Sequence, residues 1–137
     1  MSLAVRLGLD HLSSLAVIGL CKNAGKTVAI GRLLQEAVAL GRTVGLLSTG
    51  MDGERRDSVF GHPKPPVRVT PGMWVATARE GFAAANAAFG PLRKMDIETP
   101  FGVIALAPVT QPGEITLIGP RTLSQADVVM AALREHG

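Results

Sequence analysis

The sequence predicts an α/β fold, and three consecutive segments near its beginning carry that prediction. Residues 15–18 (LAVI) form a short, uncharged apolar run, which is typical of a strand buried on both faces of a parallel sheet. Residues 19–27 follow as a glycine-containing loop. Apolar residues then recur at helical spacing from Ala29 to Leu40, and the pattern stops at Gly41, a residue type common just after a helix. A strand, a loop and a helix in this order begin a right-handed strand–helix–strand unit.

The loop reads GLCKNAGKT and ends in the Gly-Lys-Thr pattern of a phosphate-binding loop (P-loop). Backbone N–H groups at the start of the following helix form a positively polarised nest for phosphate oxygens, which a Cβ at Gly25 would obstruct. Lys26 is expected to contact the β- and γ-phosphates, and the Thr27 hydroxyl to ligate Mg²⁺. The residues predicted to bind the nucleotide are Lys22, Asn23, Ala24, Gly25, Lys26 and Thr27.

One feature departs from the usual spacing G-x-x-x-x-G-K-[ST]. That spacing places a glycine at position 20, whereas this chain has Leu20 and carries the glycine at Gly19. A loop longer by one residue resembles that of the dethiobiotin synthetase-like branch of P-loop proteins. The longer loop therefore indicates a subclass of P-loop proteins. The competing interpretation is that Gly-Lys-Thr forms a plain turn before an amphipathic helix.

A charged loop follows the second predicted strand, residues 43–48, whose carboxyl end should lie near the phosphate loop. Asp52 in this loop is predicted to hold Mg²⁺ or to orient an attacking water, because carboxylate oxygens suit a hard cation. Together with Lys26 it is the predicted catalytic pair, and a solvated surface loop is the alternative. Weaker candidates in the same loop are the carboxylates of Glu54 and Asp57 and, as phosphate contacts, Arg55 and Arg56.

The rest of the chain predicts strands first and a helix last. Residues 61–75 form a proline-rich extended connection into short strands, and residues 79–88 form an alanine-rich helix. Two apolar runs around the Pro112–Gly113 turn, residues 101–110 and 114–118, predict a β-hairpin. A final helix is expected over 124–135. The expected architecture is a single P-loop NTPase-type domain over 1–137, a parallel sheet core with a β-rich insertion or hairpin at about 61–118.

The amino-acid composition and charge of the chain limit the possible classes of function. The chain has 137 residues, enough for one domain, and its 47% hydrophobic and 18% charged residues are typical of a globular protein. A formal charge of +3 is too small to favour nucleic acid, and no apolar run is long enough to cross a membrane. Cys21 is the only cysteine, which excludes an intrachain disulfide and fits a reducing compartment. A soluble cytoplasmic protein is expected.

The acidic residue that usually completes the magnesium site of a P-loop NTPase follows a buried strand. Here the predicted strand at 103–107 is followed by Pro108, and the one at 115–118 by Gly119 and Pro120, none of which can ligate a metal. We therefore expect an incomplete domain, an N-terminal fragment whose missing acid lies downstream.

Several stretches together resemble the P-loop reactivating subunit associated with adenosylcobalamin-dependent lysine 5,6-aminomutase. They are residues 22–27, residues 47–57 with Asp52-Gly53-Glu54, Lys64-Pro65, residues 75–78, and Pro112-Gly113-Glu114 with Gly119-Pro120. The resemblance implies an ATP-dependent accessory factor that helps to exchange damaged cobalamin from an aminomutase. It also implies a downstream strand ending in Asp-Gly-Ala, which would supply the acid.

Two other functions stay open. One is an ATP-dependent ligase or small-molecule kinase of the dethiobiotin synthetase-like type, which would need an acceptor pocket near the Asp52 loop. The other is a nucleotide-binding module that does not hydrolyse its ligand. The expected ligands are ATP and Mg²⁺, since the Asn-Lys-x-Asp guanine-reading motif is absent from the sequence, although GTP is not excluded. Self-association into a homo-oligomer is left open.

Overall fold

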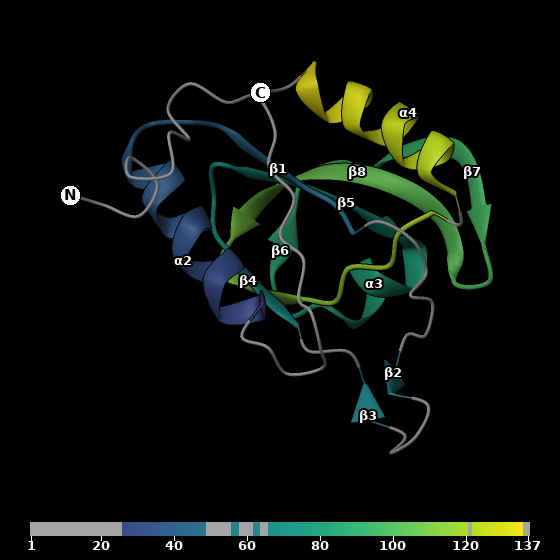
Figure 1. The fold of residues 1–137 in the computed structure, drawn as a ribbon, viewed down its shortest axis with the longest axis horizontal. Helices are drawn as coiled ribbons and strands as arrows, with labels where there is room; N and C mark the ends of the chain where they lie inside the picture. Colours follow the sequence, from purple (N-terminus) through teal and green to yellow (C-terminus); the bar gives the residue numbers. More distant parts are fainter. Residues whose placement is uncertain (1–25, 49–55, 58–61, 64–65, 121, 136–137) are drawn as a thin grey trace.

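The computed structural model describes residues 26–48, 56–57, 62–63, 66–120 and 122–135, which form a mixed α/β fold (Figure 1). The strand expected at 15–18 lies outside the described residues. The elements are α2 (Lys26–Ala39), β1 (Val44–Leu46), β2 (Arg56–Asp57), β3 (His62–Pro63), β4 (Val67–Val69), β5 (Met73–Ala78), α3 (Arg79–Ala84), β6 (Ala88–Phe89), β7 (Arg93–Thr99), β8 (Gly102–Gln111), β9 (Gly113–Ile115) and α4 (Leu123–Arg134).

Helix α2 confirms the helix predicted after the glycine-containing loop. Leu33 and Leu34 are buried on its inner face. The helix ends at Ala39, and the nearby Gly41 has a φ of 79°, the left-handed conformation that glycine adopts without steric cost. Gly41 N donates to Val38 O at 2.9 Å and Arg42 N to Ala37 O at 3.1 Å, which is the Schellman pattern of a helix end.

The main sheet has the strand order β1-β5-β8-β6, and β7 also pairs with β8. Strand β1 runs parallel to β5, with Leu46 beside Val75, whereas β5, β6 and β7 are all antiparallel to β8. The predicted α/β class is therefore confirmed with a mixed sheet, and its antiparallel pairs all lie within the region predicted as β-rich, at about 61–118. The short connection between β7 and β8 explains the direction of that pair, because a tight turn joins only antiparallel neighbours.

The two faces of β5 belong to different hydrophobic cores. Met73 and Val75 pack in a core with Leu34 of α2 and with residues of β4 and β9. Ala76 and Ala78 pack in a second core with residues of β7, β8 and α4. Because successive side chains of a strand point to opposite faces, α2 and α4 cover opposite sides of the sheet, as Figure 1 shows.

The β-hairpin predicted around Pro112 and Gly113 is not formed. Strand β9 pairs with β4 instead of β8, so the ribbon β4–β9 joins segments far apart in the sequence. Asn86 fixes this arrangement, because its Oδ1 accepts from Glu114 N at 2.6 Å and its own N donates to Glu114 O at 3.2 Å. A Cβ on Gly113 would lie 2.5 Å from Ala87 N, so only glycine fits this close approach.

The helix predicted over 79–88 is shorter than expected. It ends at Ala84, and Ala88 and Phe89 instead form β6 against β8. Phe82 and Phe89 make an edge-to-face contact with ring centroids 5.0 Å apart. Pairing with β8 and partial burial of Phe89 therefore override the helix propensity of the alanine-rich segment.

Thr77 is a fully buried polar residue that joins β5 to the segment leading to α4. Its Oγ1 accepts from Ile118 N at 2.8 Å and donates to Thr116 O at 3.2 Å. Next to it, Ala78 N donates to Ile118 O at 3.1 Å. The Thr77 hydroxyl thus adds to the hydrogen bond that the Ala78 backbone makes with this segment.

We expect Thr77→Val to lower the free energy of unfolding by about 1–3 kcal/mol, because an isosteric methyl leaves a buried N–H and a carbonyl without their partner. Thr77→Ser keeps the hydroxyl and is the matched control, with a smaller loss from the missing methyl. Chemical denaturation of the three proteins measures the difference. Equal stability of the valine and wild-type proteins would contradict the bonding role of the hydroxyl.

Gly31 and Gly41 both lie beside open space, so alanine substitutions at these two positions test the effect of backbone conformation on stability. A Cβ on Gly31 or on Gly41 would meet no atom within 4 Å, and of the two only Gly41 has a left-handed φ. Gly31→Ala should therefore raise stability by about 1 kcal/mol through helix propensity. Gly41→Ala should lower it by about 1–2 kcal/mol through backbone strain. Thermal and chemical unfolding report both changes, and a shift of the same sign in both variants would rule out this explanation.

Candidate functional site

Lys26 and Thr27, the last two residues of the predicted phosphate loop, lie at the N-terminal end of the described part of α2. The other predicted nucleotide-binding residues, Lys22, Asn23, Ala24 and Gly25, lie outside the described residues, as does Asp52. The described part of the candidate site is therefore the N-terminal end of a 14-residue helix.

The first turn of α2 contains no acidic residue, and the same holds for α4, where the Thr122 hydroxyl accepts from Gln125 N at 3.2 Å. In α3 the first turn holds Glu80. Because the first N–H groups of a helix lack intrahelical partners and its dipole is positive there, an end without an acid favours an anionic ligand.

The helix start lies toward the carboxyl end of β1. Residues 40–43 connect α2 to β1, which places the C-terminal end of the helix beside the beginning of the strand. The helix packs on the strand and runs back along it, so its N-terminal end points the other way (Figure 1). Ligands of open α/β sheets bind at the carboxyl ends of the strands.

Strands β1 and β5 present their carboxyl ends at the same edge of the sheet, because they are parallel and in register. Strand β1 ends at Leu46 and β5 at Ala78, so neither of these two strands ends in an acidic residue. The next acid after β5 is Glu80, an exposed residue of α3 whose N donates to Phe101 O at 3.0 Å. Neither β1 nor β5 therefore supplies a strand-end acid.

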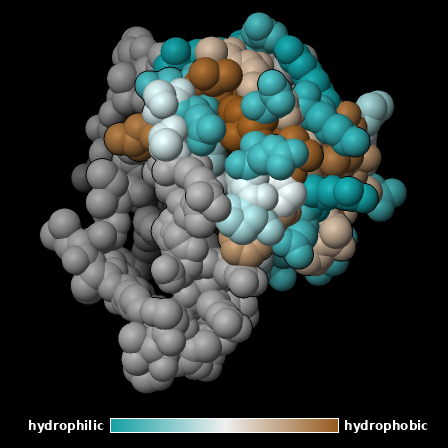
Figure 2. Space-filling view, turned by 90° about the vertical axis from the view of Figure 1, so that its right-hand side faces the viewer, coloured by the Kyte–Doolittle hydropathy of each residue, from teal (hydrophilic) through white to brown (hydrophobic). Residues whose placement is uncertain are grey.

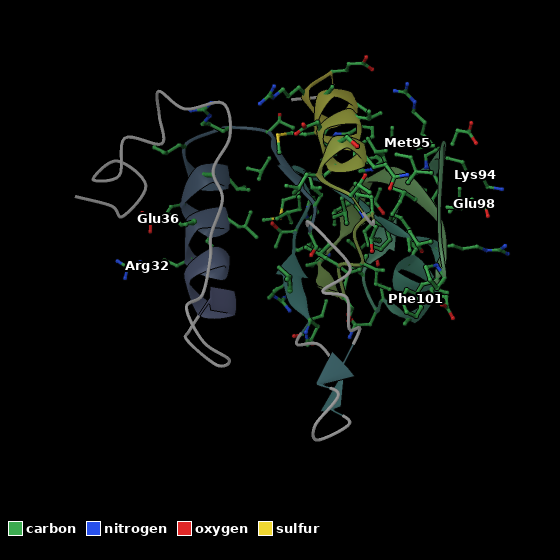
Figure 3. All side chains as sticks on the ribbon, turned by 45° about the vertical axis from the view of Figure 1, so that its right-hand side comes forward. Arg32, Glu36, Lys94, Met95, Glu98 and Phe101 are labelled. Atoms are coloured by element: carbon green, nitrogen blue, oxygen red, sulfur yellow. The ribbon has the colours of Figure 1, made fainter. Side chains whose placement is uncertain are left out.

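The weaker candidates of the charged loop are divided between described and undescribed residues. Arg56 and Asp57 form β2, opposite Pro63 and His62 of β3. This pair of strands extends away from the main sheet in Figures 1 and 3. Arg55, like Glu54, lies outside the described residues. The backbone of Arg56 and Asp57 thus belongs to a separate ribbon and does not continue β1.

The outer face of α2 carries an ion pair of its own. Arg32 Nε lies 3.2 Å from Glu36 Oε2, one helical turn away, and the arginine side chain is 68% exposed. Figure 3 shows both residues on the side of α2 that faces away from the sheet. Since Arg32 lies on the same helix as Lys26 with its charge already paired to Glu36, it provides a control position for substitutions of Lys26.

The edge strand β7 presents charges of both signs. Lys94, Asp96 and Glu98 are exposed along it, and Figure 3 shows Lys94 and Glu98 at the outer side of the strand. On the face that carries β7, Figure 2 shows hydrophobic residues in small groups among hydrophilic ones. Strand β7 therefore does not form the basic stripe that would attract a nucleic acid backbone.

Two polar residues with structural roles were not identified from the sequence. Thr77 holds the carboxyl end of β5, and Asn86 holds β9. A threonine in an apolar run is ordinary for a strand, and the partner of Thr77 lies 41 residues further along the chain. No local pattern could have indicated either bond.

Within the described part of the chain, His, Cys, Asp and Glu side chains form no group of three or more that could hold a metal ion. None of the helices described is both long and apolar enough to cross a membrane. The chain was also compared with protein-family models, curated proteins and solved structures, and none of them matches it.

Proposed function

We propose that this chain binds ATP and Mg²⁺ at the N-terminal end of α2. The observation that supports this most is that Lys26 and Thr27, the last residues of the motif, lie at the N-terminal end of the described part of α2, whose first turn contains no acidic residue. A phosphate loop requires the same order, a glycine followed by a helix whose first N–H groups face the phosphates. The position of this end toward the carboxyl end of β1 also supports the proposal.

In the proposed complex each residue of the loop has a separate role. The backbone of residues 22–25 contacts phosphate oxygens. Lys26 contacts the β- and γ-phosphates and stabilises the charge that develops on the γ-phosphate, and Thr27 ligates Mg²⁺. Asp52 orients the metal or the attacking water. These roles follow from the sequence motif and the chemistry of the side chains.

The proposed cellular role is that of an ATP-dependent accessory factor for a cobalamin-dependent aminomutase. It rests on the sequence resemblance of residues 22–27, 47–57 and 112–120. ATP hydrolysis by the complete protein would drive a conformational change in the partner enzyme that releases damaged cobalamin. This role needs an acidic residue that completes the metal site.

A second candidate function is nucleotide binding without hydrolysis. The observation in its favour is the composition of the strand ends, since the parallel strands β1 and β5 end at Leu46 and Ala78. Without a carboxylate at such a strand end, Mg²⁺ lacks one of its usual ligands and the attacking water is not activated. Nucleotide binding itself would remain, because the phosphate loop supplies most of its contacts.

The binding site is tested by isothermal titration of the folded chain with ATP and Mg²⁺. Lys26→Ala should weaken binding at least about tenfold, because a hydrogen bond from a charged group contributes about 1.5–3 kcal/mol. Arg32→Ala is the matched control, since it removes a cation from the same helix and should leave the affinity unchanged. Undetectable binding by the folded wild-type chain, or equal binding by Lys26→Ala, would refute the site.

The magnesium ligand is tested separately from the phosphate contacts. Thr27→Ala should reduce ATP affinity in Mg²⁺ to the value that the wild type shows in EDTA, whereas Thr27→Ser should keep the magnesium dependence. Titrations with and without Mg²⁺ measure this. An alanine variant that keeps the full magnesium effect would show that Thr27 is not a ligand.

Turnover separates the accessory ATPase from the binding module. For the ATPase we expect phosphate release that increases when a cobalamin-dependent aminomutase is added and that falls at least about tenfold in Asp52→Asn while ATP affinity is kept. Binding with no phosphate release under either condition would support the module and overturn the ATPase. A small-molecule product phosphorylated without any partner protein would overturn both and favour a kinase or ligase.

A further inference from the structure

We draw no further inference here: the strongest candidate, the outward face of α4 that exposes Leu123 and Val128, is an unpartnered apolar surface, and nothing in the structure shows what covers it.

Discussion

The pairing of β5 on both of its edges is the interaction on which the described fold depends. One edge pairs with β8 from Trp74 to Ala78. Strand β1 pairs with β5 over its first residues, from Met73 to Val75, and beyond β1 the Thr77 hydroxyl and Ala78 N bond to Ile118. Since both faces of β5 are also buried, the strand connects two cores that belong to different helices.

The pairing of both edges of β5 limits where a further strand can join the sheet. In the described sheet β1 lies at one end of the strand order, and β6 and β7 lie at the other. A further strand could join only at these ends, because the backbone groups of β5 already have partners on both sides. The same constraint fixes α4, since the segment bonded to Thr77 and Ala78 leads through the Thr122 cap into that helix.

The fold contributes to the candidate site by determining where the N-terminal end of α2 lies. The Schellman turn at Gly41 and the short connection to Val44 hold the C-terminal end of α2 beside the start of β1. Burial of Leu33 and Leu34 then fixes the helix face that packs inward. With its C-terminal end and its inner face fixed, the described part of the helix has its N-terminal end directed toward the carboxyl end of β1.

What the sequence determined by itself is the local structure. The helical spacing of apolar residues and the glycine at position 41 predicted α2, the run around Val44 predicted β1, and the pattern around Val129 predicted α4, because each signal lies within a few residues of the element it specifies. The phosphate motif comes from the sequence in the same way, and the described fold adds to it only that Lys26 and Thr27 lie in helix α2. The tertiary structure alone decided the direction of β8, the pairing of β9 with β4 and the early end of α3 at Ala84. These features depend on hydrogen bonds and burial between residues far apart in the chain, such as Thr77 with Ile118 and Asn86 with Glu114, which no local pattern encodes.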